Sequence, residues 1–430
     1  MTALFLRMKK RRRNEELERR QMKTSKLKMT ELGPIPADWE VKRLGDLFEL
    51  SAAGDLQSEC SSRVKTDINI HPIYSNGLEN AGLYGYTSKP RYRANSITIT
   101  GRGTLGHAEY RTVDFDAIIR LIVMRPSEML DGRYVAFQIN YLNPFHFEIT
   151  SIPQLTVPQV VQALIPVPPL PEQEKIAEAL SDVDALLSAM TTLIEKKRAI
   201  KQGAMQEMLG MRNDGSGMRN VPRRRLAGFS GEWVEKRLGE IGDFIAGNGF
   251  PLSKQGDKSG DYPFFKVSDF NNIGNENVLC VANNYISEST FSELHCSLIP
   301  SGSIVFAKIG AAIALERKRR VCYDSCIDNN MMAFCVNRQN DERFITECLR
   351  RVVFADLAES TALPALNVSK LREYKIVIPK SILEQQAIAA VLSDMDAEIA
   401  ALEAKRAKYE SIKQGMMQEL LTGRTRLKGK

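Results

Sequence analysis

One eight-residue string occurs twice in this chain with a single change. It reads IKQGAMQE at residues 200–207 and IKQGMMQE at residues 412–419. A shift of 212 residues superposes the copies and aligns residues 172–209 with 384–421 without a gap, with about half of the positions identical. Internal repetition is the first feature to settle in a sequence, and a period of this length is that of a domain. The chain is therefore a tandem duplication and not a solenoid of short repeats.

A second pair of strings opens each half. WEVKRLGD begins at Trp39 and WVEKRLGE begins at Trp233, and these are the two tryptophans of the protein. Further along, PQLTV (153–157) faces PALNV (364–368). Between these strings, short runs of β-branched and aromatic residues alternate with Gly, Asn and Ser, which predicts strands and turns. The centres of the two blocks share almost no identity, so the sequence indicates one scaffold that carries two different specificities.

A long amphipathic helix is expected after each block. Apolar residues recur every three or four positions, which is the spacing of a coiled-coil seam. Pro171 suits a first helical turn, and Ser381 with Glu384 matches a capping box. About 38 residues rising 1.5 Å each make a rod of nearly 60 Å, and neither rod can bury its apolar stripe alone. The expected seam consists of Ile176, Leu180, Val183, Leu187, Met190 and Ile194 in the first helix and Ile388, Leu392, Met395, Ile399 and Leu402 in the second.

These patterns predict a mixed α/β protein of the α+β class. We expect two tandem domains with twisted β-sheets, separated by two long helices that pack as an antiparallel coiled coil, with a pseudo-twofold internal repeat. The expected segments are a basic N-terminal tail (1–29), a first domain (30–165), a first spacer helix (166–211), a linker (212–228), a second domain (229–378), a second spacer helix (379–423) and a short tail (424–430).

The repeated string places a glycine inside each predicted helix. Gly203 and Gly415 should each cost about 1 kcal/mol relative to alanine. One interpretation is a frayed helix end or a close approach of two helices. The other is a docking surface for another subunit, duplicated because two copies of that subunit bind. The candidate docking residues are Lys201, Gln202, Gly203, Gln206, Lys413, Gln414, Gly415 and Gln418.

The formal net charge of +7 suggests a nucleic-acid partner, but its distribution weakens that inference. Residues 1–29 carry a net +8 and residues 211–225 a net +4, which leaves −5 for the rest. Any phosphate-binding face must therefore be local. Arg, Lys and Asn pair with base edges in the major groove and neutralise phosphates. The clusters of this kind are Tyr74, Ser75, Asn76, Lys89, Arg91, Arg93 and Arg102 in the first domain, and Lys266, Asn271, Asn272, Lys308, Arg317, Lys318, Arg319 and Arg320 in the second.

The cysteines and the apolar runs indicate the compartment. Seven cysteines are scattered without a C-x-x-C pair, so we expect free thiols in a reducing cytoplasm. Cys322, Cys326 and His295 match no standard zinc spacing, and structural thiols are favoured. No apolar run reaches the roughly 18–20 residues of a membrane helix, and the N-terminus lacks the charge order of a signal peptide.

Two short motifs suggest catalysis and are better explained as turns. GRGTLG (101–106) matches G-x-G-x-x-G, but strand-like residues follow where the dinucleotide fingerprint requires a helix. NPFH (143–146) lacks the second proline of the N-P-P-[YF] loop of amino-methyltransferases. No Walker A, H-E-x-x-H or G-x-S-x-G string occurs. We therefore expect no catalytic residues, no metal and no cofactor in this chain.

The order of variable block, repeated helix, variable block and repeated helix resembles the specificity (S) subunit of type I restriction–modification systems. The tryptophan strings, PQLTV before IPVPPLPEQEKIA, the L-S-D-x-D strings and IKQG-x-MQE carry this resemblance, which covers residues 30 to about 423. The second half departs from it, because IPKSILE (378–384) lacks the proline-rich helix start. That departure puts the setting of the second helix in doubt.

The resemblance implies two target-recognition domains, each reading one half of a bipartite site in double-stranded DNA, with the helices fixing the spacing. It implies a non-catalytic cytoplasmic subunit that recruits two modification subunits and restriction subunits. S-adenosylmethionine, ATP and Mg would then belong to those partners. Two alternatives stay open: an orphan DNA adenine methyltransferase using GRGTLG and NPFH, and a coiled-coil scaffold without a DNA role. Unlike centres within like frames disfavour the scaffold.

Overall fold

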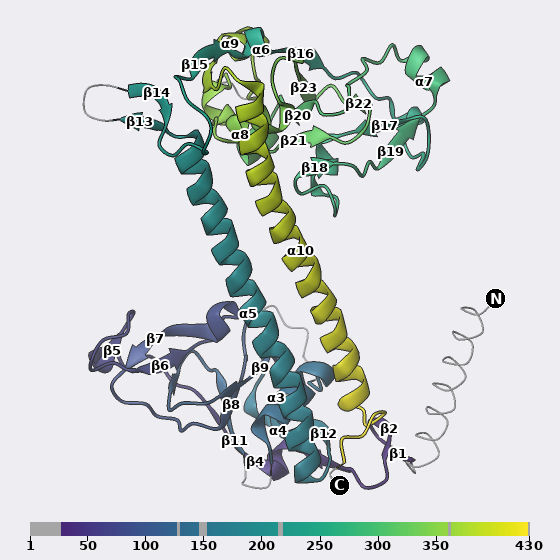
Figure 1. Ribbon diagram of the computed structural model, residues 1–430. Helices are drawn as coiled ribbons and strands as arrows, with labels where there is room; N and C mark the ends of the chain where they lie inside the picture. Colours follow the sequence, from purple (N-terminus) through teal and green to yellow (C-terminus); the bar gives the residue numbers. More distant parts are fainter. Residues whose placement is uncertain (1–26, 127–129, 146–152, 214–217, 360–362, 429–430) are drawn as a thin grey trace, which may run out of the picture. The chain divides into compact units, whose positions relative to one another are not determined.

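The computed structural model describes residues 27–126, 130–145, 153–213, 218–359 and 363–428. The chain divides into two compact units, residues 1–192 with 404–430 and residues 193–403. Helix α5 (Leu170–Leu209) begins in the first unit and ends in the second, whereas α10 (Ile382–Leu420) begins in the second and ends in the first (Figure 1). Each unit thus contains the start of one long helix and the end of the other. The predicted α+β class with two tandem domains and two long helices is confirmed.

The first unit contains two four-stranded sheets. One has the order β4-β11-β8-β9 and is antiparallel, and the other has the order β10-β6-β7-β5, with β10 parallel to β6. A ribbon of β3 and β12 joins the first tryptophan string to the segment before α5. The strands are β1 (Leu27–Thr30), β2 (Gly33–Pro36), β3 (Glu40–Arg43), β4 (Phe48–Ala52), β5 (Ser61–Ser62), β6 (His71–Tyr74), β7 (Leu83–Thr87), β8 (Ser96–Ile99), β9 (Ala108–Arg111), β10 (Asp116–Ala117), β11 (Ile122–Pro126) and β12 (Leu164–Val167). The short helices are α2 (Leu44–Leu47), α3 (Gly132–Leu142) and α4 (Val157–Gln162).

The second unit repeats this topology. The order β4-β11-β8-β9 recurs as β16-β23-β20-β21, to which β18 adds in parallel, and β10-β6-β7 recurs as β22-β17-β19. The strands are β13 (Met211–Asn213), β14 (Met218–Pro222), β15 (Val234–Arg237), β16 (Gly242–Ala246), β17 (Tyr262–Phe265), β18 (Val278–Leu279), β19 (Asn284–Ile286), β20 (Ile304–Ala307), β21 (Lys318–Val321), β22 (Cys326–Ile327), β23 (Met331–Val336) and β24 (Lys375–Ile378). The short helices are α6 (Leu238–Ile241), α7 (Glu288–Glu293), α8 (Glu342–Arg350) and α9 (Val368–Glu373). The duplication therefore includes the centres of the two domains, although their sequences hardly match. Strand pairing uses backbone groups and requires only the right alternation of apolar side chains, so it survives changes of sequence.

The two long helices run antiparallel, as predicted. In the first unit Lys413 Nζ lies 2.5 Å from Asp184 Oδ1, and Arg406 Nε donates to Thr191 Oγ1 at 3.0 Å. Residue numbers thus rise along α5 as they fall along α10. The ion pair between Lys413 and Asp184 has an equivalent in the second unit, where Lys201 Nζ lies 2.6 Å from Asp396 Oδ2.

These two ion pairs explain why the IKQG and L-S-D-x-D strings both occur in each half. Under the shift of 212 residues, Lys201 corresponds to Lys413 and Asp184 to Asp396. The lysine of each IKQG string therefore bonds to the second aspartate of the L-S-D-x-D string on the other helix. An antiparallel pair with twofold pseudosymmetry makes every cross-helix contact twice, so both strings are needed in both halves.

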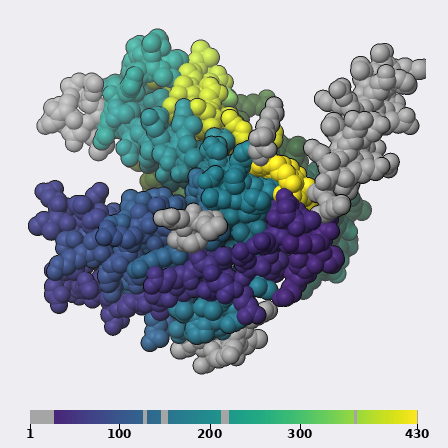
Figure 2. Space-filling model, turned by 90° about the horizontal axis from the view of Figure 1, so that it is seen from below, coloured from purple at the N-terminus to yellow at the C-terminus, as the bar shows by residue number. Residues whose placement is uncertain are grey.

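A buried glutamate joins three parts of the first unit. Glu172, at the start of α5, is 3% exposed and accepts from Trp39 Nε1 at 3.2 Å. Arg426, beyond the end of α10, donates to the same carboxylate at 2.7 and 2.6 Å and to Asp38 at 2.8 and 2.9 Å. This pairing holds the pKa of Asp38 well below its usual range. In Figure 2 the yellow C-terminal residues accordingly lie against the purple residues that open the first domain.

The second unit contains the same cluster. Glu384, at the start of α10, is 2% exposed and accepts from Trp233 Nε1 at 3.2 Å and from Arg225 at 2.9 and 2.7 Å. Arg225 also donates to the carbonyls of Ser230 and Gly231. The predicted capping box of Ser381 and Glu384 is therefore wrong, because both carboxylate oxygens of Glu384 are bound to Arg225 and Trp233.

A hairpin hides the equivalence of the two arginines in the sequence. Strands β13 and β14 pair after the end of α5, and Arg224 N then bonds to Glu207 O at 2.9 Å. Thr425 N bonds to Glu419 O at 3.0 Å after α10, without such a hairpin. Arg225 is the residue after Arg224, and Arg426 is the residue after Thr425. The two arginines are therefore equivalent, although they are 201 residues apart and the rest of the repeat is offset by 212.

Both long helices start in the same way despite their different sequences. The amide of Gln173 accepts from Asp131 N at 3.1 Å and donates to Pro168 O at 2.8 Å. Gln385 accepts from Asp341 N at 2.9 Å and donates to Pro379 O at 3.0 Å. Although the second half lacks the proline-rich start, α10 is therefore bonded to its domain in the same way as α5.

The ends of both helices are also bound by the domain that they reach. Gln138 Nε2 donates to Leu421 O at 3.2 Å, just beyond α10, and Arg351 donates to Leu209 O at the end of α5. The last carbonyls of a helix have no partner within it, and here a domain side chain supplies one. Leu420 and Leu421 join the core around Trp39, while Met208 and Leu209 join the core around Trp233.

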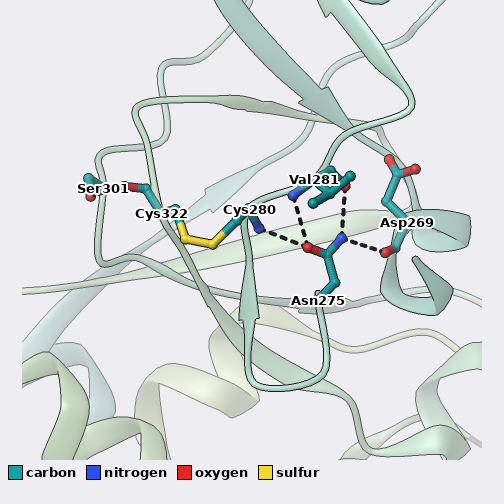
Figure 3. The surroundings of a disulfide bond; sticks show 6 residues. All are labelled: Asp269, Asn275, Cys280, Val281, Ser301 and Cys322. Carbon is teal, nitrogen blue, oxygen red and sulfur yellow. Dashed lines mark hydrogen bonds between the residues drawn. A yellow bond between two sulfur atoms is a disulfide. The ribbon is translucent and has the colours of Figure 1, made fainter. Parts of the chain in front are cut away.

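The expectation that all cysteines are free thiols is wrong. Cys280 and Cys322 form a disulfide with a Cα–Cα distance of 5.1 Å (Figure 3), within the range that such a bond requires. They directly follow β18 and β21, whose parallel pairing brings them together. Spacing along the chain did not reveal this, because the pair is 42 residues apart.

Two further searches concern membranes and metals. In the part of the chain that the structure describes, no helix is both long and apolar enough to span a membrane. Within the same residues, no group of three or more His, Cys, Asp or Glu side chains is arranged to hold a metal ion.

We expect Arg426→Met to destabilise the protein by about 3 kcal/mol, because it leaves a buried carboxylate without its cation. Urea unfolding of the full chain would measure this, with Arg424→Met at an exposed tail position as the matched control. Adding Glu172→Gln to Arg426→Met should recover part of the loss. Equal effects of Arg426→Met and Arg424→Met would contradict the role of the buried pair.

Candidate nucleic-acid interface

Three loops of the first domain meet at one end of its sheets. Asn76, two residues after β6, donates from Nδ2 to Ile119 O at 2.7 Å, and its Oδ1 accepts from Gly101 N at 2.7 Å and Arg102 N at 3.2 Å. One amide thus ties the loops after β6, β8 and β10. Arg102, Ile119 and Arg120 are exposed around it. We call Asn76, Arg102, Ile119 and Arg120 the first loop face.

The turn that carries Arg120 is strained. Ile119 and Arg120 both have φ of 58°, a left-handed conformation that a β-branched residue rarely adopts. Their amides donate to Gly54 O at 3.1 Å and Ala53 O at 3.2 Å, which holds the turn in place. Strain of this kind persists where the surroundings enforce it, and it is concentrated at binding and catalytic sites. Sequence analysis missed Arg120, because its apolar neighbours in AIIRLIV gave no signal.

The second domain brings together the corresponding loops. Lys308, directly after β20, donates its amide to Asn330 O at 2.9 Å, and Asp328 N bonds to Phe265 O at 2.9 Å beside Lys266. Lys266 Nζ donates to Gln255 Oε1 at 2.9 Å. We call Lys266, Lys308, Asn329 and Asn330 the second loop face.

The two loop faces occupy the same topological positions with different side chains. The first lies where β6, β8 and β10 end, and the second lies where the equivalent strands β17, β20 and β22 end. The first presents two arginines, and the second presents two lysines and two asparagines. Loops on a rigid sheet are where binding residues concentrate. The arrangement provides one frame with two chemically distinct surfaces.

Three of the predicted DNA contacts in the first domain are used inside it. Tyr74 packs on Phe115 with ring centroids 5.6 Å apart, and Ser75 Oγ donates to Gly82 O at 3.4 Å. Arg91 forms a bidentate pair with Asp116, at 2.6 and 3.1 Å, whose side chain is buried. The Asp116 carboxylate raises the pKa of Arg91 through this bond. These three half-buried side chains are thus bonded or packed within the domain.

Lys89 and Arg93 are exposed but lie outside the first loop face. They belong to the connection between β7 and β8. Arg93 forms an ion pair with Asp114 at 3.0 Å while its side chain stays 86% exposed. Asn76 and Arg102 are thus the predicted residues that the structure places in the first loop face.

The basic run of the second domain is split by the alternation of β21. Lys318 is 2% exposed, pairs with Glu316, and donates to Val352 O at 2.8 Å. Burial lowers the pKa of this amine. The prediction that Lys318 contacts DNA is therefore wrong, because a strand points successive side chains to opposite faces.

The neighbours of Lys318 have other partners. Arg320 lies 3.9 Å from Glu342. Arg317 Nη1 donates to Asn271 Oδ1 at 2.7 Å, and Arg319 Nη1 donates to Phe270 O at 2.6 Å. Asn272 Nδ2 donates to Val281 O at 3.0 Å. Arg317, Arg319, Asn271 and Asn272 therefore belong to one loop assembly at the end of the short helix η4 (Val267–Asn271).

Of the two motifs that suggested catalysis, GRGTLG is a turn in the structure, as predicted, and the described part of NPFH follows the end of α3. GRGTLG connects the antiparallel strands β8 and β9, with Gly106 N bonding to Thr100 O at 2.8 Å. No helix begins at these glycines. Asn143 ends α3 in the left-handed conformation and Phe145 packs in the core, whereas His146 lies outside the described residues.

The predicted docking residues divide into two groups. Lys201 and Lys413 form the cross-helix ion pairs described above. Both helices continue past their glycines, to Leu209 and Leu420, so a frayed helix end is excluded. Apart from the nearby backbone of its own helix, an added Cβ at Gly203 or Gly415 would meet no described atom within 4 Å. A close approach of the other helix at these glycines is therefore excluded as well. Gln202, Gln206, Gln414, Gly415 and Gln418 are exposed.

Comparisons with known proteins agree with this architecture. A family model described as "Type I restriction modification DNA specificity domain" matches residues 36–201 and 230–413. The specificity subunit of the MjaIX type I restriction enzyme of Methanocaldococcus jannaschii is 23% identical over 83% of this chain and 86% of that protein. A putative MjaX specificity subunit from the same organism is 23% identical over 94% and 98%. The crystal structure of a type I system S subunit from M. genitalium superposes with a TM-score of 0.62 at 16% identity, over 92% of this chain and 98% of that one.

We expect Asn76→Ala to destabilise the protein by about 1–2 kcal/mol, because two amides and one carbonyl of three loops lose their partner. Thermal or urea unfolding would measure this. Arg102→Ala, at an exposed position of the same face, should stay within about 0.5 kcal/mol. Unchanged stability of Asn76→Ala would show that the three loops are held together by other contacts.

Proposed function

The chain belongs to the type I restriction–modification DNA specificity family, and from that premise we propose that it selects the DNA sites of a type I complex without catalysing a reaction itself. Each domain would read one half of a bipartite site in double-stranded DNA. The observation that carries this proposal is the pair of loop faces, which share one frame and differ in their side chains. Arginine is suited to guanine, asparagine to adenine and lysine to guanine or phosphate.

The long helices supply the spacing in this proposal. Two domains that read one duplex must keep a fixed distance and a fixed rotation about it. Helix α5 is the continuous link between the domains, and α10 returns along it within each unit. A bonded helix pair keeps this phase better than a flexible linker does.

Partners supply the chemistry in this proposal. Modification subunits would bring S-adenosylmethionine, and restriction subunits would bring ATP and Mg, to a complex in the cytoplasm where the DNA is. The exposed glutamines of each IKQG string support docking of two modification subunits; Gly415 is exposed beside them and Gly203 is half-buried. A glycine that costs helix stability, and whose added Cβ would meet no described atom within 4 Å, is explained if another protein approaches its backbone there. The hairpin connection at GRGTLG removes the helix that an orphan methyltransferase would need.

The decisive experiment is to co-express the chain with its modification subunit and map methyladenine by single-molecule sequencing. We expect a motif of two short half-sites at constant spacing. A second variant would carry seven extra helical residues after Met190 and seven after Leu402, which are equivalent positions. Each insertion adds about 10 Å, so the gap should grow by about three base pairs at 3.4 Å each while both half-sites stay the same. A continuous motif would contradict the proposal.

The docking surface makes a separate prediction. Gly203→Ala with Gly415→Ala should stabilise the free chain by up to about 2 kcal/mol in total and yet weaken its association with the modification subunit. Urea unfolding and isothermal titration calorimetry would measure the two effects. Thr192→Ala, at an exposed position of α5, is the control that should leave association unchanged. Undiminished association of the double variant would refute docking at these glycines.

A further inference from the structure

An exposed isoleucine lies at the tip of a rigid loop in the second domain. Ile273 is 92% exposed, between η4 and β18. Single exposed apolar residues are common on protein surfaces and carry no message by themselves. The environment of Ile273 differs from that ordinary case, because the loop beneath it is held by buried polar side chains and is flanked by cationic ones.

The first support of the loop is a fully bonded, buried amide. Asn275 is 0% exposed, and its Nδ2 donates to Asp269 O and Val281 O, both at 2.8 Å. Its Oδ1 accepts from Cys280 N and Val281 N, both at 2.9 Å. Figure 3 shows this amide between Asp269 on one side and the disulfide-bonded Cys280 on the other. Both ends of the loop are thereby fixed to each other.

The second support is a buried carboxylate. Asp269 is also 0% exposed, and it accepts from Lys266 N at 2.7 Å and from Asn283 Nδ2 at 2.5 Å. Asn272, next to the isoleucine, donates to the same carboxylate at 3.4 Å. Buried polar groups that are fully bonded make a structure rigid and specific. The backbone that presents Ile273 is therefore organised before any partner binds.

Two arginines beside the loop come from the segment of β21. Arg317 donates to Asn271 Oδ1 at 2.7 Å, and Arg319 donates to Phe270 O at 2.6 Å. Glu276 belongs to the same loop, where its carboxylate accepts from Gly274 N at 3.1 Å. The segment that carries Ile273 begins with η4, whose N-cap is Lys266, a member of the second loop face. Amide and cationic side chains, together with the carboxylate of Glu276, thus lie around an apolar tip on the end of the domain that carries the second loop face.

We propose that Ile273 reads a thymine by apolar contact with its C5-methyl group in the major groove of the second half-site. That methyl is the apolar feature of the major-groove code. A rigidly held aliphatic tip beside Asn271 and Arg317 suits it, since the remaining donors of these polar neighbours can meet adjacent bases and phosphates. The proposal rests on the DNA-reading function proposed above and adds the chemical feature that one loop recognises.

Replacing thymine by uracil tests the contact, because it removes the methyl group and nothing else. The binding affinity of the assembled modification complex would be measured by fluorescence anisotropy on its mapped site, with uracil placed at each thymine in turn. At one position of the second half-site, uracil should weaken binding of the natural chain about fourfold, as expected for one buried methyl-sized group. Ile273→Ala should weaken binding to the thymine duplex similarly and lose nothing further with uracil.

Matched variants distinguish a methyl contact from a general loss of DNA binding. Ile273→Val keeps branched methyl groups and should retain the uracil effect. Leu252→Ala, at a position that is 85% exposed in the same domain, should bind like the natural chain. The dependence on salt concentration should stay the same for Ile273→Ala, since no phosphate contact is lost.

Three results would overturn the proposal. These are a second half-site without an A·T pair, no uracil effect at any of its positions, and an Ile273→Ala variant that assembles more weakly with the modification subunit but binds DNA normally at concentrations that restore the complex. The third result would assign the loop to a protein partner. Absence of a bipartite site altogether would instead refute the function proposed in the previous section.

Discussion

A buried carboxylate bonded to an arginine from the far end of the repeat holds each half of this protein together. Glu172 and Glu384 start the two long helices, and each is removed from water. Transfer of a charge out of water costs several kcal/mol unless a partner compensates it. Arg426 and Arg225 supply that partner from beyond the end of the other helix. Each domain is therefore complete only with the end of the helix that starts in the other half.

This dependence explains how the domains vary without loss of the architecture. The tryptophans, the helix starts and the helix ends are bonded in the same way in both units, whereas the three loops at the end of each sheet are free to differ. Asn76 organises the loops of the first domain through its side chain. In the second domain backbone bonds to Asn330 and Phe265 have the same role. One frame thus supports two surfaces of different chemistry.

The long helices combine two functions in one repeated string. The lysine of each IKQG string faces the partner helix and fixes the antiparallel register through its aspartate. The glutamines that follow are exposed, and an added Cβ at the glycine would meet no described atom within 4 Å. A helix presents residues three or four apart on one face and the intervening residues on others. The string therefore recurs for a structural reason and, in our proposal, for a binding reason as well.

The sequence by itself determined the duplication, the α+β class and the antiparallel helices. Identity at a fixed offset and apolar spacing are visible without coordinates, because helix periodicity is a local property. The strand-like residues that follow GRGTLG also predicted the turn there. The basic and amide residues of the first block led to Asn76 and Arg102, which the structure places in the first loop face.

Only the tertiary structure decided which polar residues face solvent and which face each other. The burial of Lys318, the disulfide of Cys280 and Cys322, and the strained turn at Arg120 each depend on strands that are distant in sequence. The equivalence of Arg225 and Arg426 was hidden because the hairpin of β13 and β14 changes the offset between the halves. A contact between distant residues leaves no periodic trace in one sequence, and so it is fixed only when the backbone brings its partners together.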